Sequence, residues 1–122
     1  MPVELRLKRV YDEPADDDGE RLLVDRLWPR GISKEVARID LWAKDFTPSN
    51  ELRKWFHADP SRIDEFAIRY LQELEQRKNT IEQILFSLQQ STITLVTATT
   101  DLENGHAAIL KRFLQPLLQK RG

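Results

Sequence analysis

Two polar segments carry the side chains whose types and spacing could do chemistry. The first, DRLWPRG at residues 25–31, places Arg26 and Arg30 on either side of Trp28. The planar guanidinium of arginine matches phosphate and carboxylate groups and stays charged in proteins, so this spacing favours an anion-binding site with a flat aromatic wall. Asp25 can pair with one of the two arginines, which leaves Arg30 as the one expected to be free.

The second segment is TATTDLENGH at residues 97–106. It offers hydroxyl, amide and imidazole groups that can hydrogen-bond to an anion, and His106 can gain or lose a proton near neutral pH. A capping or core role for His106 is equally open. The sequence predicts a small anionic ligand bound by Arg26, Trp28, Arg30, Thr100 and Asn104, with His106 as the candidate catalytic acid or base.

Each candidate also has a purely structural interpretation. Asp25 and Arg26 could form an ion pair that only stabilises the loop. Tryptophans are more often buried in a core than presented to a ligand, and this applies to Trp28. His57 follows Phe56 at the expected end of a helix, where a positive side chain interacts favourably with the helix terminus. From the sequence, a structural role and a ligand-binding role are therefore both open for these residues.

Composition limits the metal-binding and covalent alternatives. The chain has no Cys, which excludes disulfides, thiolate nucleophiles and iron–sulfur clusters, and it has two His. A metal site would have to combine His57 and His106 with carboxylates, and the sequence contains no HxH or HExxH spacing. We therefore expect neither a metal nor a cofactor.

Charge is unevenly distributed although its total is balanced. The chain has 19 Lys and Arg against 20 Asp and Glu, a formal net charge of −1, which argues against a globally basic nucleic-acid binder. Residues 12–20 hold six acids and no base, as expected of a solvated loop. Residues 21–57 then hold eight Lys and Arg, five acids and all three Trp. The alternative function is therefore a non-catalytic nucleic-acid or protein interaction module that uses this basic, aromatic segment.

Each of the two polar segments overlaps or follows a run that is typical of a buried strand. Leu22–Val24 is a short continuous apolar run, and Ile93–Ala98 is rich in β-branched residues. Residues 3–7 alternate between apolar and charged side chains, which predicts a strand with one wet face near a sheet edge. Residues 39–43 are a candidate for a further short strand.

Helix signals lie between and after these strands. The expected helix starts are Ser33, Thr47-Pro48, Asp59-Pro60, Thr80 and Thr100. The last two form potential capping boxes with Gln83 and Glu103, and residues 63–74 show the clearest helical periodicity. Pro116 should kink or end the last helix. The expected core residues are Leu23, Val24, Phe66, Tyr70, Ile84, Leu95, Leu110 and Phe113.

This order of elements predicts one small α/β domain over residues 1–122, with a mainly parallel sheet flanked by helices. If Leu22–Val24 and Ile93–Ala98 are parallel neighbours, both polar segments leave the same edge of the sheet, where parallel sheets bind ligands. The last helix, starting near Thr100, would add backbone N–H groups for an anion. We find no signal peptide and no membrane-spanning run, so we expect a cytoplasmic protein, and we leave its oligomeric state open.

Three longer segments carry a resemblance to a known family. DGERLLVDRLWPRGISK, DLWAKDFTPSNELRKWFHADP and NGHAAILKRFL are similar to the YeaO-like branch of the bacterial family known as domain of unknown function 488, over nearly the whole chain. The resemblance implies a small cytoplasmic α/β domain whose activity is not established. The family usually has Asn-His-Ala near the last helix, where this chain has Gly105, His106 and Ala107.

Overall fold

The computed structural model describes residues 3–121 and contains a four-stranded parallel sheet. The strands are β1 (Glu4–Arg9), β2 (Glu20–Leu23), β3 (Leu41–Trp42) and β4 (Thr92–Thr97). Their order across the sheet is β1-β4-β2-β3, and every neighbouring pair is parallel. This confirms the α/β class, the edge position of the first strand and the parallel pairing of the two buried runs.

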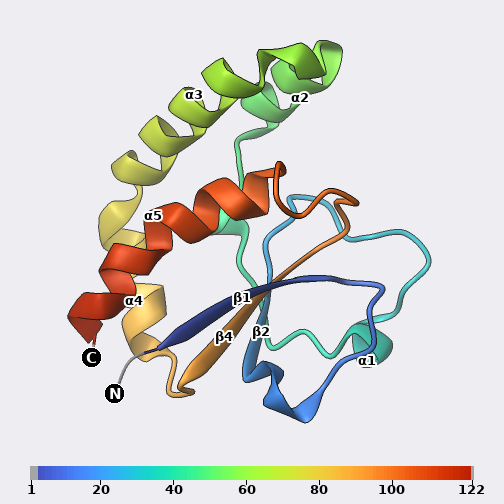
Figure 1. Ribbon diagram of the computed structural model, residues 1–122, viewed down its shortest axis with the longest axis vertical. Coiled ribbons are helices and arrows are strands. Elements are labelled where there is room, and N and C mark those ends of the chain that lie inside the picture. Colours follow the sequence, from blue (N-terminus) through green and yellow to red (C-terminus); the bar gives the residue numbers. More distant parts are fainter. Residues whose placement is uncertain (1–2, 122) are drawn as a thin grey trace.

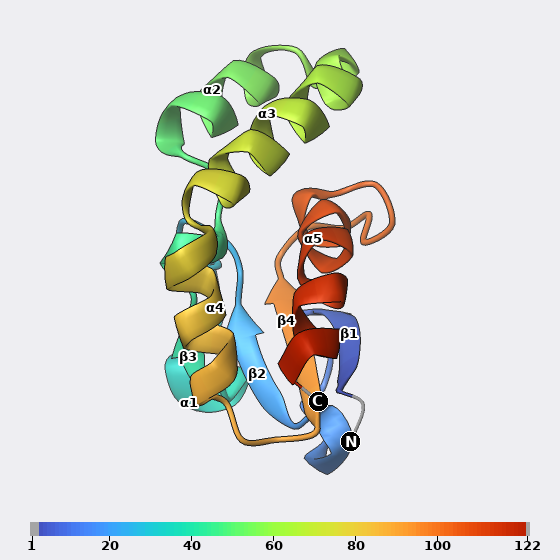
Figure 2. The ribbon, with the colours of Figure 1, turned by 90° about the vertical axis from the view of Figure 1, so that its left-hand side faces the viewer.

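Helices cover the sheet and extend beyond it. They are α1 (Lys34–Ala37), α2 (Asn50–Ala58), α3 (Ile63–Gln76), α4 (Lys78–Ser87) and α5 (His106–Arg121). Figure 1 shows α4 and α5 on one side of the sheet and α1 on the other. In Figure 2, α2 and the first turns of α3 rise beyond the carboxyl ends of the strands. This places α2 above the edge of the sheet from which the two polar segments emerge.

The two inner strands bury both faces because their side chains alternate in direction. Leu22 and Leu95 belong to the larger core, which the sheet forms with α2 to α5. Val96 belongs to a smaller core on the other face, with Val10 and Ala37. Of the expected core residues, those that are buried are Leu23, Val24, Phe66, Tyr70, Leu95 and Leu110. Ile84 and Phe113 are only half-buried against the larger core.

Some expected helix starts are confirmed and others are wrong. The Ser33 hydroxyl accepts a hydrogen bond from the backbone N–H of Val36 and caps α1, as expected. Asp59 caps a short 3-10 turn at Pro60–Arg62, which leads directly into α3. Thr80 is wrong as a start, because only Arg77 separates α3 from α4, and Thr80 therefore lies inside α4.

The start of α2 is shifted from Thr47 to Ser49. The Ser49 hydroxyl accepts the N–H of Leu52 at 3.1 Å, and its own proton goes to the Glu73 carboxylate at 2.5 Å. Thr47 instead donates to the carbonyl oxygen of Lys44 at 2.7 Å and closes the turn before the helix. The carboxylate that α3 presents to Ser49 therefore selects the cap, and the sequence near Thr47 does not reveal it.

The last helix also differs from its expected form. It begins at His106 and not near Thr100, because residues 102–104 form a turn and residue 105 a bend. Asp101 accepts the backbone N–H of Asn104 at 3.2 Å, which stabilises this turn and replaces the expected capping box. Pro116 lies inside α5, so it does not end the helix.

Asp18, in the acidic run, is buried and not solvated. Its Oδ2 accepts a hydrogen bond from Arg21 Nη1 at 2.6 Å and from Lys8 Nζ at 3.2 Å. Arg21 Nε and Nη2 both donate to the carbonyl oxygen of Ala37, at 3.0 and 2.8 Å. Burial opposes the charge of Asp18, but the Ala15 N–H and the two cations outweigh it and lower its pKa. The ion pair joins the acidic loop, β2 and α1.

Candidate functional site

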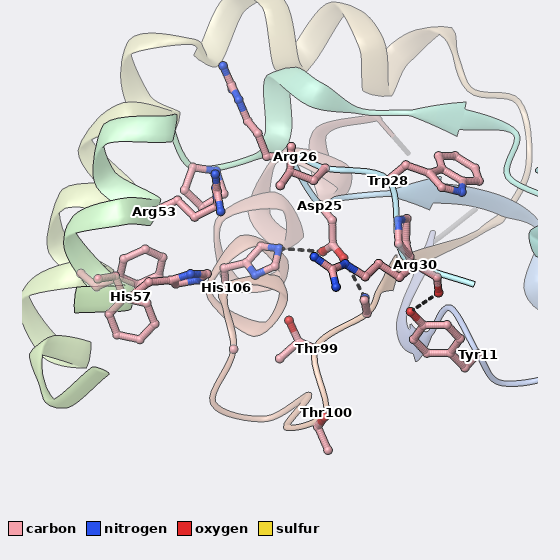
Figure 3. Close-up of a pocket in the computed structure, with 17 residues that line it drawn as sticks. Tyr11, Asp25, Arg26, Trp28, Arg30, Arg53, His57, Thr99, Thr100 and His106 are labelled. Carbon is pink, nitrogen blue, oxygen red and sulfur yellow. Dashed lines mark hydrogen bonds and ion pairs between the residues drawn. The ribbon is translucent and has the colours of Figure 1, made fainter. Parts of the chain in front are cut away.

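A cavity lies where the carboxyl ends of β2 and β4 meet α2. Residues 24–31 leave β2 and residues 98–105 leave β4, and both segments emerge at the same edge because the strands are parallel neighbours. Helix α2 supplies a further wall (Figure 3). The cavity has a volume of about 570 Å³. The two polar segments of the sequence therefore line one crevice.

Asp25 and His106 form a hydrogen-bonded pair in the cavity wall. His106 Nε2 lies 3.2 Å from Asp25 Oδ1, which also accepts a hydrogen bond from the Thr97 hydroxyl at 2.6 Å. Asp25 Oδ2 accepts the backbone N–H of Ala98 at 2.8 Å. Burial disfavours the charged carboxylate, but these hydrogen bonds, led by that of His106, outweigh it and hold the pKa of Asp25 below its ordinary value. Asp25 is therefore an ionised acid whose partners come from β4, the segment after it and α5.

The ring of His106 is anchored through one nitrogen. Nε2 also lies 2.9 Å from the carbonyl oxygen of Val24. A carbonyl and a carboxylate only accept hydrogen bonds, so we assign the ring proton to Nε2, which donates to both. In the neutral ring Nδ1 is then an acceptor, and Figure 3 shows it pointing away from Asp25. One nitrogen therefore stabilises the fold, and the other is available to a ligand.

Three arginines line the cavity, and none of them has an ion-pair partner among residues 3–121. Arg30 is exposed in the loop after β2, and its carbonyl oxygen accepts the Tyr11 hydroxyl at 2.8 Å. Arg53 is half-buried on α2, and its Nε is buried with no hydrogen-bond partner in the described chain. In Figure 3, Arg53 and His57 lie on one side of His106 and Arg30 lies on the other. The cavity therefore has guanidinium groups from two separate elements, and the one acid among its lining residues, Asp25, is hydrogen-bonded to other groups.

Arg26 also lines the cavity, but its guanidinium is directed elsewhere. Nη1 donates to the Thr47 hydroxyl at 3.3 Å, and in Figure 3 the side chain points away from His106 and Arg30. Arg26 reaches a second, separate hollow that Lys44 also lines. The ion pair between Asp25 and Arg26 that the sequence allows is absent from the described residues, because Asp25 is bonded to β4 and α5.

The tryptophans hold the loops in place. Trp28 donates its indole N–H to the carbonyl oxygen of Ile32 at 2.8 Å, and Trp42 donates to the carbonyl oxygen of Asp25 at 2.7 Å. The two rings meet edge to face at 5.5 Å. Trp28 is half-buried and still lines the cavity, whereas Trp55 lies outside it. Both the core and the ligand interpretation of Trp28 therefore remain compatible with its position.

Thr100 and Asn104 take different positions. Thr100 is exposed and lines the cavity, but Asn104 does not, because its side-chain amide donates to Asp101 at 2.8 Å within the turn. Asn104 lines a different hollow beside α5. Gly105 lies between the turn and the cavity, and a Cβ atom there would come within 2.9 Å of the Thr99 methyl group. A side chain at residue 105 would therefore require the Thr99 side chain or the turn at Asp101 to shift.

Arg53 and Tyr11 are cavity residues that the sequence reasoning does not single out. Arg53, Phe56 and His57 are spaced i, i+3 and i+4, which puts them on one face of α2, and this spacing is the signal that could have revealed Arg53. His57 lies in the last turn of α2, as expected, and it also lines the cavity. No local pattern marks Tyr11, whose place depends on the packing of the edge strand.

Within residues 3–121, no three His, Asp or Glu side chains are grouped in a way that could hold a metal ion. Over the same part of the chain, no helix is both long and apolar enough to cross a membrane. His57 and His106 line the same cavity, with Asp25 as the acid in its wall.

The chain matches a known protein family. Residues 4–122 match the family described as the inactive DUF488-N3 subclade. An uncharacterised protein of Mycobacterium tuberculosis is 44% identical over 112 residues, which cover 92% of this chain and 94% of that protein. The uncharacterised protein YeaO of Escherichia coli is 38% identical over 115 residues, which cover 94% of this chain and all of YeaO. No solved structure matches. The chain is therefore a YeaO-like member of the DUF488 family and belongs to its subclade described as inactive.

Proposed function

We propose that the cavity binds a small anionic ligand, which carries a phosphate or carboxylate group, and that it does so without converting it. The observation that carries the proposal is Arg53. Its guanidinium lines the cavity, its Nε is buried without an acceptor, and it has no ion-pair partner among the described residues. A buried cationic donor without a partner is costly, and an anion in the cavity would remove that cost.

The other charges in the cavity support the same ligand. Arg30 reaches the cavity from the side opposite to Arg53, and its guanidinium can donate a second pair of hydrogen bonds to the anion. The acid in the wall, Asp25, is already hydrogen-bonded to His106, Thr97 and Ala98. Its negative charge is therefore compensated within the fold, so it opposes an incoming anion less than a free carboxylate would.

Binding without conversion fits both the family and the geometry of His106. The family model that the chain matches is described as inactive. His106 Nε2 is committed to Val24 and Asp25, so only Nδ1 can contact a ligand. Nδ1 of the neutral ring only accepts hydrogen bonds, so it does not donate to an anion. In this proposal His106 holds Asp25 and the cavity wall in place, and the acid or base role expected from the sequence is not required.

The alternative, an interaction module built on residues 21–57, has less support. The indole N–H groups of Trp28 and Trp42 are used inside the fold. Arg62 and Arg69 lie over the ring of Trp55, at 4.9 and 4.4 Å from its centroid. The aromatic surfaces that would stack on bases are therefore partly occupied by the protein itself.

Isothermal titration calorimetry with sodium phosphate and sodium acetate, at constant ionic strength, tests the proposal. Arg53→Ala should weaken binding of the tighter anion by about 1.5–3 kcal/mol, the range for charge-assisted hydrogen bonds. Arg112→Ala, at an exposed site on α5 outside the cavity, is the matched control and should leave binding unchanged. The proposal fails if neither anion binds, or if the two variants behave alike. Binding of an oligonucleotide with a steep salt dependence would favour the interaction module instead.

A further inference from the structure

The wall of the cavity opposite the sheet is apolar and aromatic, although the charges around it are cationic. Pro48 and Phe56 line this wall from the segment that leads into α2 and from α2 itself, and Phe66 lines it from α3. Leu27 lines the cavity with 61% of its side chain and backbone surface exposed. An inorganic anion would contact the charges and leave this apolar surface wet.

The aromatic part of the wall is rigid. The rings of Phe56 and Phe66 stack with their centroids 4.3 Å apart and an angle of 26° between their planes. Phe66 is 3% exposed and packs against the fully buried Tyr70, with ring centroids 5.7 Å apart. Phe56 is therefore held by a column of rings, and the aromatic surface that it contributes to the cavity lining does not have to be ordered when a ligand binds.

A charge stands beside this aromatic surface on the same helix. Arg53 precedes Phe56 by three residues, so the two side chains are neighbours on one face of α2. The cavity volume of about 570 Å³ lies in the range of sites that hold organic molecules, well above the size of a single phosphate ion. One helix thus presents a cation and an aromatic ring to a cavity that is large enough for both ends of an organic ion.

We infer that the ligand is an aromatic anion, which is a flat ring that carries a phosphate or carboxylate group. The anionic group lies between Arg53 and Arg30, and the ring packs against Phe56. This inference deepens the proposed function and rests on it. It adds that the apolar body of the ligand contributes to affinity, and that a flat body fits better than a puckered one of the same size.

Four compounds, titrated calorimetrically into the full chain at one ionic strength, test the inference. They are inorganic phosphate, phenyl phosphate, cyclohexyl phosphate and benzoate. We expect phenyl phosphate to bind at least about tenfold more tightly than inorganic phosphate, since it buries the apolar surface of its ring. Cyclohexyl phosphate, which has a similar volume and no flat face, should bind more weakly than phenyl phosphate. Benzoate shows whether the site accepts a carboxylate in place of the phosphate.

Variants locate the effect at the aromatic wall. Phe56→Leu should remove most of the advantage of phenyl phosphate over inorganic phosphate and leave the affinity for inorganic phosphate within about twofold. Phe86→Leu, at an exposed phenylalanine on α4 outside the cavity, is the matched control. If Phe56→Leu does not fold, nuclear Overhauser contacts between phenyl phosphate and the Phe56 ring in the unmodified protein replace this measurement.

The outcomes separate this inference from the proposed function. Equal affinities for phenyl phosphate and inorganic phosphate, both lowered by Arg53→Ala, would overturn the inference and leave anion binding intact. Cyclohexyl phosphate binding as tightly as phenyl phosphate would also overturn it. If none of the four compounds binds, both the inference and the proposed function fail.

Discussion

His106 Nε2 lies 3.2 Å from Asp25 Oδ1, and this contact ties the loop after β2 to the first turn of α5. The same carboxylate accepts hydrogen bonds from Thr97 and Ala98 at the end of β4. Three segments that are distant in the sequence therefore meet at one side chain. Asp25 fixes the position of the loop that carries Arg30 relative to the rest of the cavity.

We expect Asp25→Asn to lower the free energy of unfolding by about 1–3 kcal/mol, the cost of leaving buried hydrogen-bonding groups unpaired. The variant replaces one acceptor oxygen by an amide that would face N–H or O–H donors. Denaturant titration measures the change. Asp64→Asn, at an exposed site on α3, is the control and should stay within about 0.5 kcal/mol of the unmodified protein. If Asp25→Asn is as stable as this control, the hydrogen bonds of Asp25 contribute nothing.

Stability should fall at acidic pH because of the buried ion pair of Asp18. Its pKa is lowered in the folded protein, so its contribution is complete above the ordinary pKa of aspartate and is lost as the pH falls through the folded-state value. We expect the free energy of unfolding to decrease from about pH 5 downward. The decrease should be shallower in Asp18→Asn, which lacks the titrating group. Unfolding curves measured at several pH values check this, and identical slopes in the two proteins would contradict it.

Arg30 and Arg26 should contribute unequally to anion binding. Arg30 has no ion-pair partner in the described chain and reaches the cavity, whereas Arg26 donates to the Thr47 hydroxyl at 3.3 Å. Arg30→Ala should weaken phosphate binding by about 1.5–3 kcal/mol with little change in stability. Arg26→Ala should have a smaller effect on binding. Calorimetric titration of both variants measures the difference, and a larger loss in Arg26→Ala would reverse this assignment.

Leu95→Ala tests the core under the site. Leu95 is fully buried in the middle of β4, between β1 and β2, so its truncation should leave a cavity that costs about 2–5 kcal/mol of stability. Ile68→Ala, on the exposed side of α3, is the comparison and should cost far less. A loss below about 1 kcal/mol for Leu95→Ala would mean that the surrounding core collapses to fill the space.

Local patterns were sufficient to predict which parts of the chain form the inner strands and the main helices, but not where every helix begins. The apolar run at Leu22–Val24, the β-branched run at Ile93–Ala98 and the periodicity of residues 63–74 all correspond to buried strands or a helix in the structure. These patterns depend on which face of a segment is apolar, and each segment carries that information itself. The same holds for DRLWPRG, whose proline and glycine interrupt any strand and leave its arginines in a loop.

The site depended on contacts that no single segment contains. Thr97 is 72 residues from Asp25, and Val24 is 82 residues from His106, yet their hydrogen bonds decide the partner of Asp25 and the proton position on His106. The Glu73 carboxylate of α3 accepts the hydroxyl proton of Ser49, the cap of α2, and α2 is the helix that carries Arg53 to the cavity. The side chain of Asn104 donates a hydrogen bond to Asp101 within its own turn, and the guanidinium of Arg26 donates one to the Thr47 hydroxyl. Neither side chain therefore directs its polar group to a ligand in the cavity, although the sequence predicts that both do. A sequence pattern specifies which face of a segment is buried, but the hydrogen-bond partner of a polar group is set by whichever distant donor or acceptor the packed elements place beside it.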